Sequence, residues 1–309
     1  MNKVLVIVGP TGVGKTALSI ELAKKFQGEV ISGDSMQIYK GLDIGTAKIR
    51  PDEMAGVPHH LIDIREMQEQ YSVAEFQKEA RKKIAEITAR GHLPIVVGGT
   101  GLYIQALLYD YQLGSEKDAE SVGDLGLREK YTSFAKANGN QALWKLLQER
   151  DPQAAEKIHF NNQRKVVRAL EVFELTGKSI MQPEQTPQKL FDYFLIGLTT
   201  ERETLYQRIN QRVDMMMAEG LEQEAEQLRE IPFAQAARGI GYKEFLPYFE
   251  GQQSLEATIE EIKLHSRRYA KRQLTWFRNR MAPLWIDLIN HPESIETLEE
   301  SVKKWLEVP

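Results

Sequence analysis

The chain has 309 residues, of which 42% are hydrophobic and 27% charged, and this composition excludes a mainly disordered or fibrous protein. Its 40 basic and 44 acidic residues leave a formal net charge of −4, which excludes a strongly basic nucleic-acid coat protein but not a local basic surface. The absence of cysteine excludes disulfides, thiolate metal sites and cysteine nucleophiles. The apolar run Val4–Val8 is too short to span a membrane, so a soluble, cytoplasmic protein is expected.

Short apolar runs alternate with helical patterns over the first hundred residues. Val4–Val8 is rich in β-branched residues, as is typical of a strand buried on both faces of a parallel sheet, and residues 17–26 follow with helical spacing. A capping box at Ser72 predicts a helix over 72–89. Three more strands are expected at 29–32, 60–64 and 94–97. This order predicts an α/β fold with a doubly wound parallel sheet.

The middle of the chain has a different character. Residues 114–126 and 183–187 are polar and predict loops, and only helical patterns are recognisable between 127 and 177. A strand is expected again at 191–198. We therefore predict two domains, an α/β core at 1–112 and 190–309 and a mainly helical insertion at 113–189.

Helices are predicted to dominate the rest of the core. Thr200 is expected to cap a long helix, and further helices carry the chain to Arg280. A last strand is expected at 283–288.

Residues 9–16, named here the phosphate loop, fit the pattern G-x-x-x-x-G-K-[ST] at every fixed position. Lys15 supplies a mobile charge, and the Thr16 hydroxyl is placed to hold Mg²⁺. An ordinary glycine-rich turn is the alternative, but the position between a buried strand and a helix favours binding of a diphosphate or triphosphate group. The residues expected to bind it are Gly9, Thr11, Gly12, Val13, Gly14, Lys15 and Thr16.

Two polar residues follow other strands of the predicted sheet. Asp34 follows the second strand and Thr100 follows the strand at 94–97, so both are expected at the edge that carries the phosphate loop. Asp34 can hold Mg²⁺ through water, accept a proton or only cap the next turn. The glycines around Thr100 fit either a close approach to phosphates or a tight turn. The strand at 94–97 does not end in the Asp that phosphoryl-transfer enzymes of this class use for Mg²⁺, which counts against a kinase.

Several segments together resemble the tRNA dimethylallyltransferases, and the likeness runs from about Lys3 to Arg280. These segments are 9–16, 33–39, 43–48, 59–63, 98–103, 168–172, 239–242 and 271–277. The resemblance implies transfer of a dimethylallyl group from dimethylallyl diphosphate to N6 of the adenosine 3′ of the anticodon in tRNA, with Mg²⁺. It further implies that Asp34 is the general base, that Thr100 contacts the bridging oxygen of the diphosphate and that Arg212 binds pyrophosphate.

Elementary chemistry agrees with these implied roles. The exocyclic amine of adenine is a poor nucleophile that must lose a proton as the new bond forms, so a carboxylate beside it is useful. The charge that develops on departing pyrophosphate can be stabilised by Lys15, Arg212, Mg²⁺ and the amides of the phosphate loop.

A basic stretch near the end of the chain is the expected RNA-binding surface. No acid interrupts its seven bases, Lys263, Arg267, Arg268, Lys271, Arg272, Arg278 and Arg280. A solvated helix face is the alternative, but the lack of balancing acids favours contact with RNA phosphates.

A second basic segment lies in the predicted insertion. Asn161 or Asn162 can cap a helix whose first turn carries Arg164 and Lys165, which is unfavourable beside the positive end of the helix dipole. Either bound RNA phosphate or an intramolecular salt bridge would relieve that cost, and the sequence does not favour one over the other.

The residues expected to contact tRNA are Asp34, Ser35, Met36, Gln37, Gly101, Gln163, Arg164, Lys165, Arg168, Gly239, Gly241, Tyr242, Lys243, Arg268, Lys271 and Arg272. Gln37 is expected to read the target adenine, because an amide can pair with its donor and acceptor edge. His59 and His60 are interpreted as structural histidines, and the run 215–217 of methionines as core or as the wall of a prenyl channel.

The expected partners are the anticodon stem-loop of tRNA and dimethylallyl diphosphate, bound by a monomer. Two other functions remain open, a phosphate-loop kinase of a nucleoside or small metabolite with the insertion as a lid, and a nucleotide-dependent RNA-binding protein.

Overall fold

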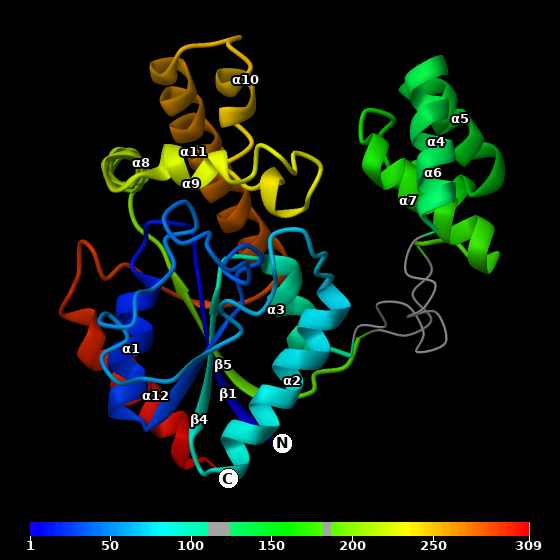
Figure 1. Ribbon diagram of the computed structural model, residues 1–309. Helices are drawn as coiled ribbons and strands as arrows, with labels where there is room; N and C mark the ends of the chain where they lie inside the picture. The colour runs from blue at the N-terminus through cyan, green and yellow to red at the C-terminus, as the bar shows by residue number, and fades with distance from the viewer. Residues whose placement is uncertain (111–123, 182–186, 309) are drawn as a thin grey trace. The chain divides into compact units, whose positions relative to one another are not determined.

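A six-stranded, all-parallel sheet with the order β3-β2-β4-β1-β5-β6 forms the centre of the computed structural model (Figure 1). The structure describes residues 1–110, 124–181 and 187–308. The strands are β1 (Lys3–Val8), β2 (Gly28–Ser32), β3 (His59–His60), β4 (Leu93–Gly98), β5 (Asp192–Leu198) and β6 (Leu284–Ile286). Parallel pairing directs the carboxyl ends of all six strands to one edge, where ligands bind in such folds.

Helices cover both faces of this sheet, as the predicted fold class requires (Figure 1). Alternate residues of β1 point to opposite faces: Val4, Val6 and Val8 pack in one buried cluster, and Leu5 and Ile7 in the other. The first cluster includes α2 (Val73–Ala89) and α3 (Gly101–Leu108), and the second includes α1 (Lys15–Lys25) and α12 (Ser294–Glu307).

The remaining helices of this unit gather beyond one end of the sheet in Figure 1. They are α8 (Arg202–Glu219), α9 (Leu221–Glu226), the short 3₁₀ helix η1 (Ala236–Arg238), α10 (Phe245–Phe249) and α11 (Leu255–Arg280). The long helix α11 packs against α8 and α3, and its buried Phe277 belongs to the main core. In the part of the chain that the structure describes, no helix is long and apolar enough to cross a membrane.

The chain divides into two compact units, one of Met1–Tyr111 with Lys189–Pro309 and one of Gln112–Gln188. The second unit contains α4 (Leu125–Asn138), α5 (Asn140–Arg150), α6 (Pro152–Lys157) and α7 (Gln163–Thr176) around its own apolar cluster.

Several predicted elements are confirmed. Ser72 caps α2 through a complete capping box, and the helix ends at Ala89 as expected. The strands expected at 29–32, 94–97 and 191–198 correspond to β2, β4 and β5.

Three local predictions are wrong. The strand expected at 60–64 stops at His60, because Leu61 and Asp63 adopt left-handed φ angles of 60° and 54° that an extended strand cannot include. Thr200 does not cap α8: the N-cap is Glu201, which makes no side-chain cap, and Thr200 accepts a hydrogen bond from Asn290 at 3.1 Å.

The loop expected at 114–126 ends earlier than predicted, since Asp124 caps a helix that begins at Leu125. The rest of that loop, and most of the one expected at 183–187, lies outside the described residues.

Candidate functional site

The phosphate loop joins β1 to α1 at the carboxyl edge of the sheet. Gly14 is the N-cap of α1 and has a φ of 99°, a left-handed conformation that favours glycine. Gly9 packs against β5, where a Cβ would lie 2.6 Å from the carbonyl oxygen of Leu198. The loop therefore presents the free N–H groups of a helix N-terminus at the edge where the strands end, which is a favourable position for a phosphate.

Lys15 lies in an environment with an excess of positive charge. Its Nζ donates to the carbonyl oxygens of Gly9 at 3.1 Å and Pro10 at 2.7 Å. Burial and the nearby charge of Arg212 lower the pKa of Lys15 to about 8, while Asp34 opposes the shift. Burial also lowers the pKa of Arg212, against the opposing charge of Asp34. Lys15, Arg212 and Asp34 are thus electrostatic neighbours, and one carboxylate does not balance two cations.

Asp34 and Thr100 meet at the same edge, as predicted. Asp34 Oδ1 accepts the backbone N–H of Met36 at 2.8 Å, so the turn-capping role considered from the sequence is present. Among the described residues, Oδ2 has no hydrogen-bond partner. Thr100 Oγ1 accepts the backbone N–H of Ser35 at 3.3 Å, which joins the turn after β2 to the turn after β4. One carboxylate oxygen of Asp34 is therefore bound to the backbone, and the other is available to accept a further hydrogen bond.

Gln273 on α11 is a site residue that the sequence analysis did not single out. Its Oε1 accepts the backbone N–H of Thr11 at 3.0 Å, and its Nε2 donates to the carbonyl oxygen of Gly99 at 3.0 Å. The side chain is 5% exposed. Gln273 therefore fastens the phosphate loop to the end of β4. The segment 271–277 carries part of the resemblance, and within it Gln273 is an uncharged residue whose role depends on distant backbone groups.

The glycines beside Thr100 are explained by the close approach of α11. A Cβ at Gly99 would lie 2.0 Å from Gln273 Nε2, and one at Gly101 would lie 2.2 Å from Trp276 Cδ1. The ring of Trp276 leaves no space for a Cβ at Gly101, whereas at Gly99 the end of the Gln273 side chain would have to shift. A contact of Gly101 with tRNA stays a prediction.

Tyr269 joins the same group from α11. Burial and the charge of Asp34 raise the pKa of Tyr269 to about 12, while its hydrogen bonds with Thr100 and Gln273 oppose the shift. The phenol therefore remains protonated at neutral pH, and it can act as a hydrogen-bond donor beside Asp34 and Thr100.

The basic stretch of α11 is only partly free. Lys263 binds Asp214 at 2.8 Å and Glu260 at 3.0 Å, so the prediction that no acids balance this stretch is wrong at that position. Arg267 donates to Asn210 at 2.6 Å. Five bases are exposed and have no ion-pair partner within the described ranges: Arg268, Lys271, Arg272, Arg278 and Arg280. These five are named here the α11 basic surface.

The predicted tRNA residues near α9 are mostly buried. The Tyr242 hydroxyl donates to Glu224 at 2.7 Å and the residue is 4% exposed, so a direct RNA contact does not fit it. Gly239 and Gly241 are also buried, whereas Lys243 is exposed.

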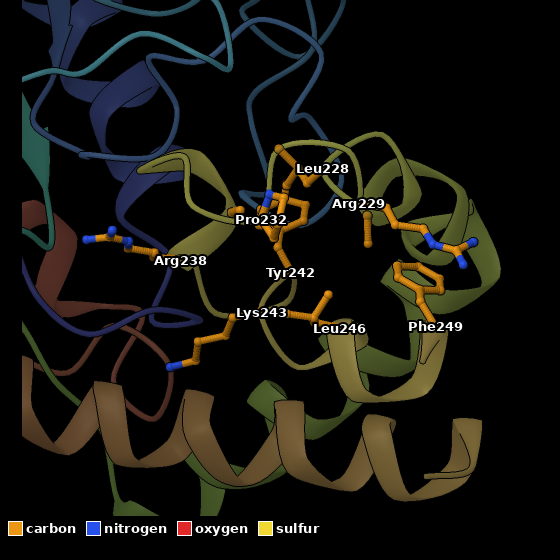
Figure 2. Close-up of a pocket in the computed structure, with 10 residues that line it drawn as sticks. Leu228, Arg229, Pro232, Arg238, Tyr242, Lys243, Leu246 and Phe249 are labelled. Carbon is orange, nitrogen blue, oxygen red and sulfur yellow. The ribbon is translucent and has the colours of Figure 1, made fainter. Parts of the chain in front are cut away.

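A cavity of about 130 Å³ lies beside Tyr242 (Figure 2). Leu228, Pro232 and Phe249 contribute to its apolar lining, while the side chains of Arg238 and Lys243 extend away from it toward the same side. None of the predicted catalytic residues lines this cavity, so it is separate from the phosphate loop.

Gln37 is held in place by three neighbours. Its Oε1 accepts the Ser32 hydroxyl at 3.1 Å, and its Nε2 donates to the carbonyl oxygens of Thr46 at 3.2 Å and Ala47 at 3.4 Å. The amide has two N–H groups and two oxygen lone pairs. Because a single N–H can serve both carbonyls, this orientation leaves one donor and one acceptor for another group.

The second unit carries the remaining basic residues. Asn162 is the N-cap of α7 and accepts the backbone N–H of Lys165 at 3.4 Å. Arg164 and Lys165 are exposed and have no ion-pair partner in the described part of the chain. Arg168 binds the buried Glu171 at 2.8 Å. Of these three basic residues, therefore, only Arg168 has an intramolecular salt bridge among the described residues. Gln163 is partly buried.

Two minor predictions can also be compared with the structure. The structural interpretation of the histidine pair is confirmed for His60, which binds the buried Glu29 at 2.6 Å. The core placement is wrong for Met215, which is 58% exposed, whereas Met216 and Met217 pack against the core.

The chain is similar to known enzymes in both sequence and structure. The model of the IPP transferase family matches residues 37–280. A tRNA dimethylallyltransferase of Enterococcus faecalis is 63% identical over 307 residues, which cover 99% of this chain and 98% of that protein. The structure resembles a tRNA isopentenylpyrophosphate transferase of Bacillus halodurans, with a TM-score of 0.75, 47% identity and coverage of 99% and 97%. It also resembles a eukaryotic dimethylallyltransferase acting on tRNA, with a TM-score of 0.81, 34% identity and coverage of 97% and 78%.

Pyrophosphate binding is expected to weaken as the pH rises through the pKa of about 8 at Lys15, because the amine loses its charge above that pH. A charge-assisted hydrogen bond contributes about 1.5–3 kcal/mol, so the loss should reach roughly tenfold or more by pH 9.5. Titration calorimetry at several pH values measures it. Lys15→Arg stays charged throughout and controls for ionisation of the ligand, and parallel curves for the two proteins would contradict the assignment.

Gln273→Leu is expected to weaken pyrophosphate binding by roughly 1–2 kcal/mol, because the N–H of Thr11 loses its acceptor and the loop is no longer held. Calorimetry at pH 7 measures the change. Thr275→Ala is the matched control, since among the described residues its hydroxyl bonds only to the carbonyl oxygen of Lys271 within the same helix. Equal affinities for the two variants would show that the loop does not depend on this contact.

Proposed function

The chain belongs to the IPP transferase family, and we infer that it transfers a dimethylallyl group from dimethylallyl diphosphate to N6 of the adenosine 3′-adjacent to the anticodon of tRNA. The observation that carries this proposal is the grouping of Lys15, Arg212 and Asp34 at the end of the sheet. Two cations suit a departing diphosphate, and one available carboxylate oxygen suits a proton acceptor. The likeness to named tRNA prenyltransferases along nearly the whole chain favours this reaction over the kinase alternative.

The first half of the reaction is departure of the diphosphate. The C1–O bond of the allylic substrate breaks, and its electron pair stays on the diphosphate oxygen. Lys15, Arg212 and the N–H groups of the phosphate loop stabilise the charge that develops there. We propose that the Thr100 hydroxyl contacts the bridging oxygen, with the phenol of Tyr269 beside it as a further donor.

The second half is formation of the N6–C1 bond. The adenine amine loses a proton as it attacks, and Oδ2 of Asp34 accepts that proton. The bond between Oδ1 and the N–H of Met36 fixes the orientation of the carboxylate. Gln37, three residues further along the chain, is suited to hold the edge of the adenine.

Mg²⁺ fits the donor atoms of this site. The exposed Thr16 offers a hydroxyl in the first turn of α1, and Mg²⁺ commonly takes few protein ligands together with water and phosphate oxygens. No cluster of three or more His, Asp or Glu side chains suited to a metal occurs among the described residues, so the protein would contribute few ligands. When bound, Mg²⁺ neutralises charge on the diphosphate.

The tRNA is proposed to bind through its phosphates. The α11 basic surface lies on the same helix as Gln273 and Tyr269. Contacts between RNA phosphates and this surface would therefore place RNA beside the active site. Arg164 and Lys165 in the second unit are further candidates because they have no internal partner in the described part of the chain. Action as a monomer stays a prediction.

Label from radioactive dimethylallyl diphosphate is expected in unmodified tRNA when both are incubated with the protein and Mg²⁺. Asp34→Asn should lower turnover about 10²–10⁴-fold with saturating substrates while tRNA binding is kept, because the variant loses only the base. Lys15→Ala should also lose activity. Absence of label from the wild-type reaction, with ATP hydrolysis stimulated by a small hydroxylated acceptor, would instead indicate the kinase.

Reversing Arg268 and Arg272 to Glu should flatten the slope of log affinity for tRNA against log salt by about 0.7–0.9 for each phosphate that the protein no longer neutralises. Filter binding between about 50 and 200 mM salt measures the slope. Reversal of Lys303 and Lys304, two exposed bases on α12, is the matched control and should leave the slope unchanged. The same slope in all three proteins would mean that this face of α11 is only solvated.

A further inference from the structure

Glu224 on α9 is a buried acid without a cationic partner in the described part of the chain. It is 6% exposed. Its Oε2 accepts the backbone N–H groups of Asp43 at 2.7 Å and Ile44 at 2.8 Å. Its Oε1 accepts the N–H of Gly45 at 2.8 Å and the hydroxyl of Tyr242 at 2.7 Å. Burying a charge is costly unless its hydrogen bonds are satisfied, and here four donors converge on one carboxylate.

The segment 43–48 is therefore held at both ends. Glu224 binds its first three N–H groups, and the buried Lys48 binds Asp63 at 2.6 Å and the carbonyl oxygen of Tyr39 at 2.8 Å at the other end. Between these anchors Ala47 has a left-handed φ of 45°, which costs a residue with a Cβ about 1–2 kcal/mol. The anchors hold a backbone shape that the local sequence alone does not favour.

This shape determines the orientation of the Gln37 amide. The carbonyl oxygens that accept its Nε2 belong to Thr46 and Ala47, the residues directly after the three that Glu224 holds. An amide has no charge to orient it and can rotate about its last bond, so these two acceptors, together with the Ser32 hydroxyl that donates to Oε1, decide which face of it reaches a substrate. Glu224 and the Gln37 amide are thus connected through the backbone of residues 43–47.

The turn that contains Tyr242 packs against Gly45 and Met36. A Cβ at Gly45 would lie 2.6 Å from Cζ of Tyr242, and one at Gly239 would lie 2.5 Å from Cε of Met36. Figure 2 shows the side chain of Tyr242 near Leu228, and both residues line the cavity. Burial and then the charge of Glu224 raise the pKa of Tyr242, so its hydroxyl stays a donor.

We propose that Glu224 is a positioning residue for recognition of the target adenine, with the Tyr242 hydroxyl as its aid: together they hold the segment 43–47 that orients Gln37. This inference rests on the proposed function. Neither side chain touches the substrate. Both act through the backbone that binds the Gln37 amide.

The test compares tRNA carrying adenosine with tRNA carrying 7-deazaadenosine at the target position. The analogue keeps the amine that is prenylated and lacks only N7, the acceptor that an amide N–H reads. The ratio of kcat/KM for the two substrates therefore measures recognition of N7. A lower fraction of active protein changes both values equally and leaves the ratio unchanged. Glu224→Gln removes an acceptor for two of the four donors, Tyr242→Phe removes one donor, and Glu226→Gln is the exposed control on the same helix.

We expect the wild type and Glu226→Gln to prefer adenosine by about tenfold, and Gln37→Ala to lose the preference. Glu224→Gln should lose most of it, and Tyr242→Phe should lose part, with unchanged affinity for pyrophosphate in both. Adding Gln37→Ala to Glu224→Gln should cost nothing further, because both act on one contact.

A wild-type preference retained in Glu224→Gln, or in Tyr242→Phe should the first variant fail to fold, would overturn the inference. So would the absence of any preference in the wild type, because Gln37 would then not read N7. Failure of the wild type to prenylate tRNA would instead refute the proposed function, and the two failures are therefore distinct.

Discussion

Two partly buried cations beside a single carboxylate are the constraint on which the site depends. Burial and the charge of Arg212 lower the pKa of Lys15 to about 8, and Asp34 only partly offsets that shift. Such a pair of like charges is unfavourable unless an anion joins it. The phosphate loop adds further positive potential from the N-terminus of α1, so the repulsion between the cations is relieved by the group that the reaction releases.

In the proposed reaction the helix α11 would act on both substrates through different faces. Its inner face carries Gln273, Tyr269 and Trp276, of which Gln273 binds both the phosphate loop and the turn after β4, while Trp276 packs against Gly101. Its outer face carries the α11 basic surface. Because the helix is one rigid element, RNA bound outside and diphosphate bound inside share a common support. A residue in the segment proposed to bind RNA can therefore also matter for the diphosphate.

Recognition of the base depends on a second set of contacts, centred on Glu224. The neighbouring segments 34–37 and 43–48 and the distant segment 239–242 meet around this acid and Tyr242. The glycine at 45 makes room for the Tyr242 ring, since a Cβ there would lie 2.6 Å from Cζ, whereas a Cβ at 239 would require the end of the Met36 side chain to shift. The burial of Tyr242 follows from its part in this contact, which is why the direct RNA contact predicted for it does not fit.

The sequence by itself determined the features that depend on local pattern. The β-branched run Val4–Val8, the capping box at Ser72 and the phosphate loop are each specified by neighbouring residues, so the parallel sheet and the position of Asp34 beside Lys15 could be predicted. Tertiary structure decided what depends on contacts between distant segments. Gln273 meets Thr11 across 262 positions, and Glu224 meets Asp43 across 181. The pairing of Lys263 with Asp214 likewise could not be inferred from a stretch without acids, because the balancing charge comes from another helix. Local patterns encode backbone conformation, whereas the partner of a buried polar group is set by whichever distant donor or acceptor the fold brings within reach.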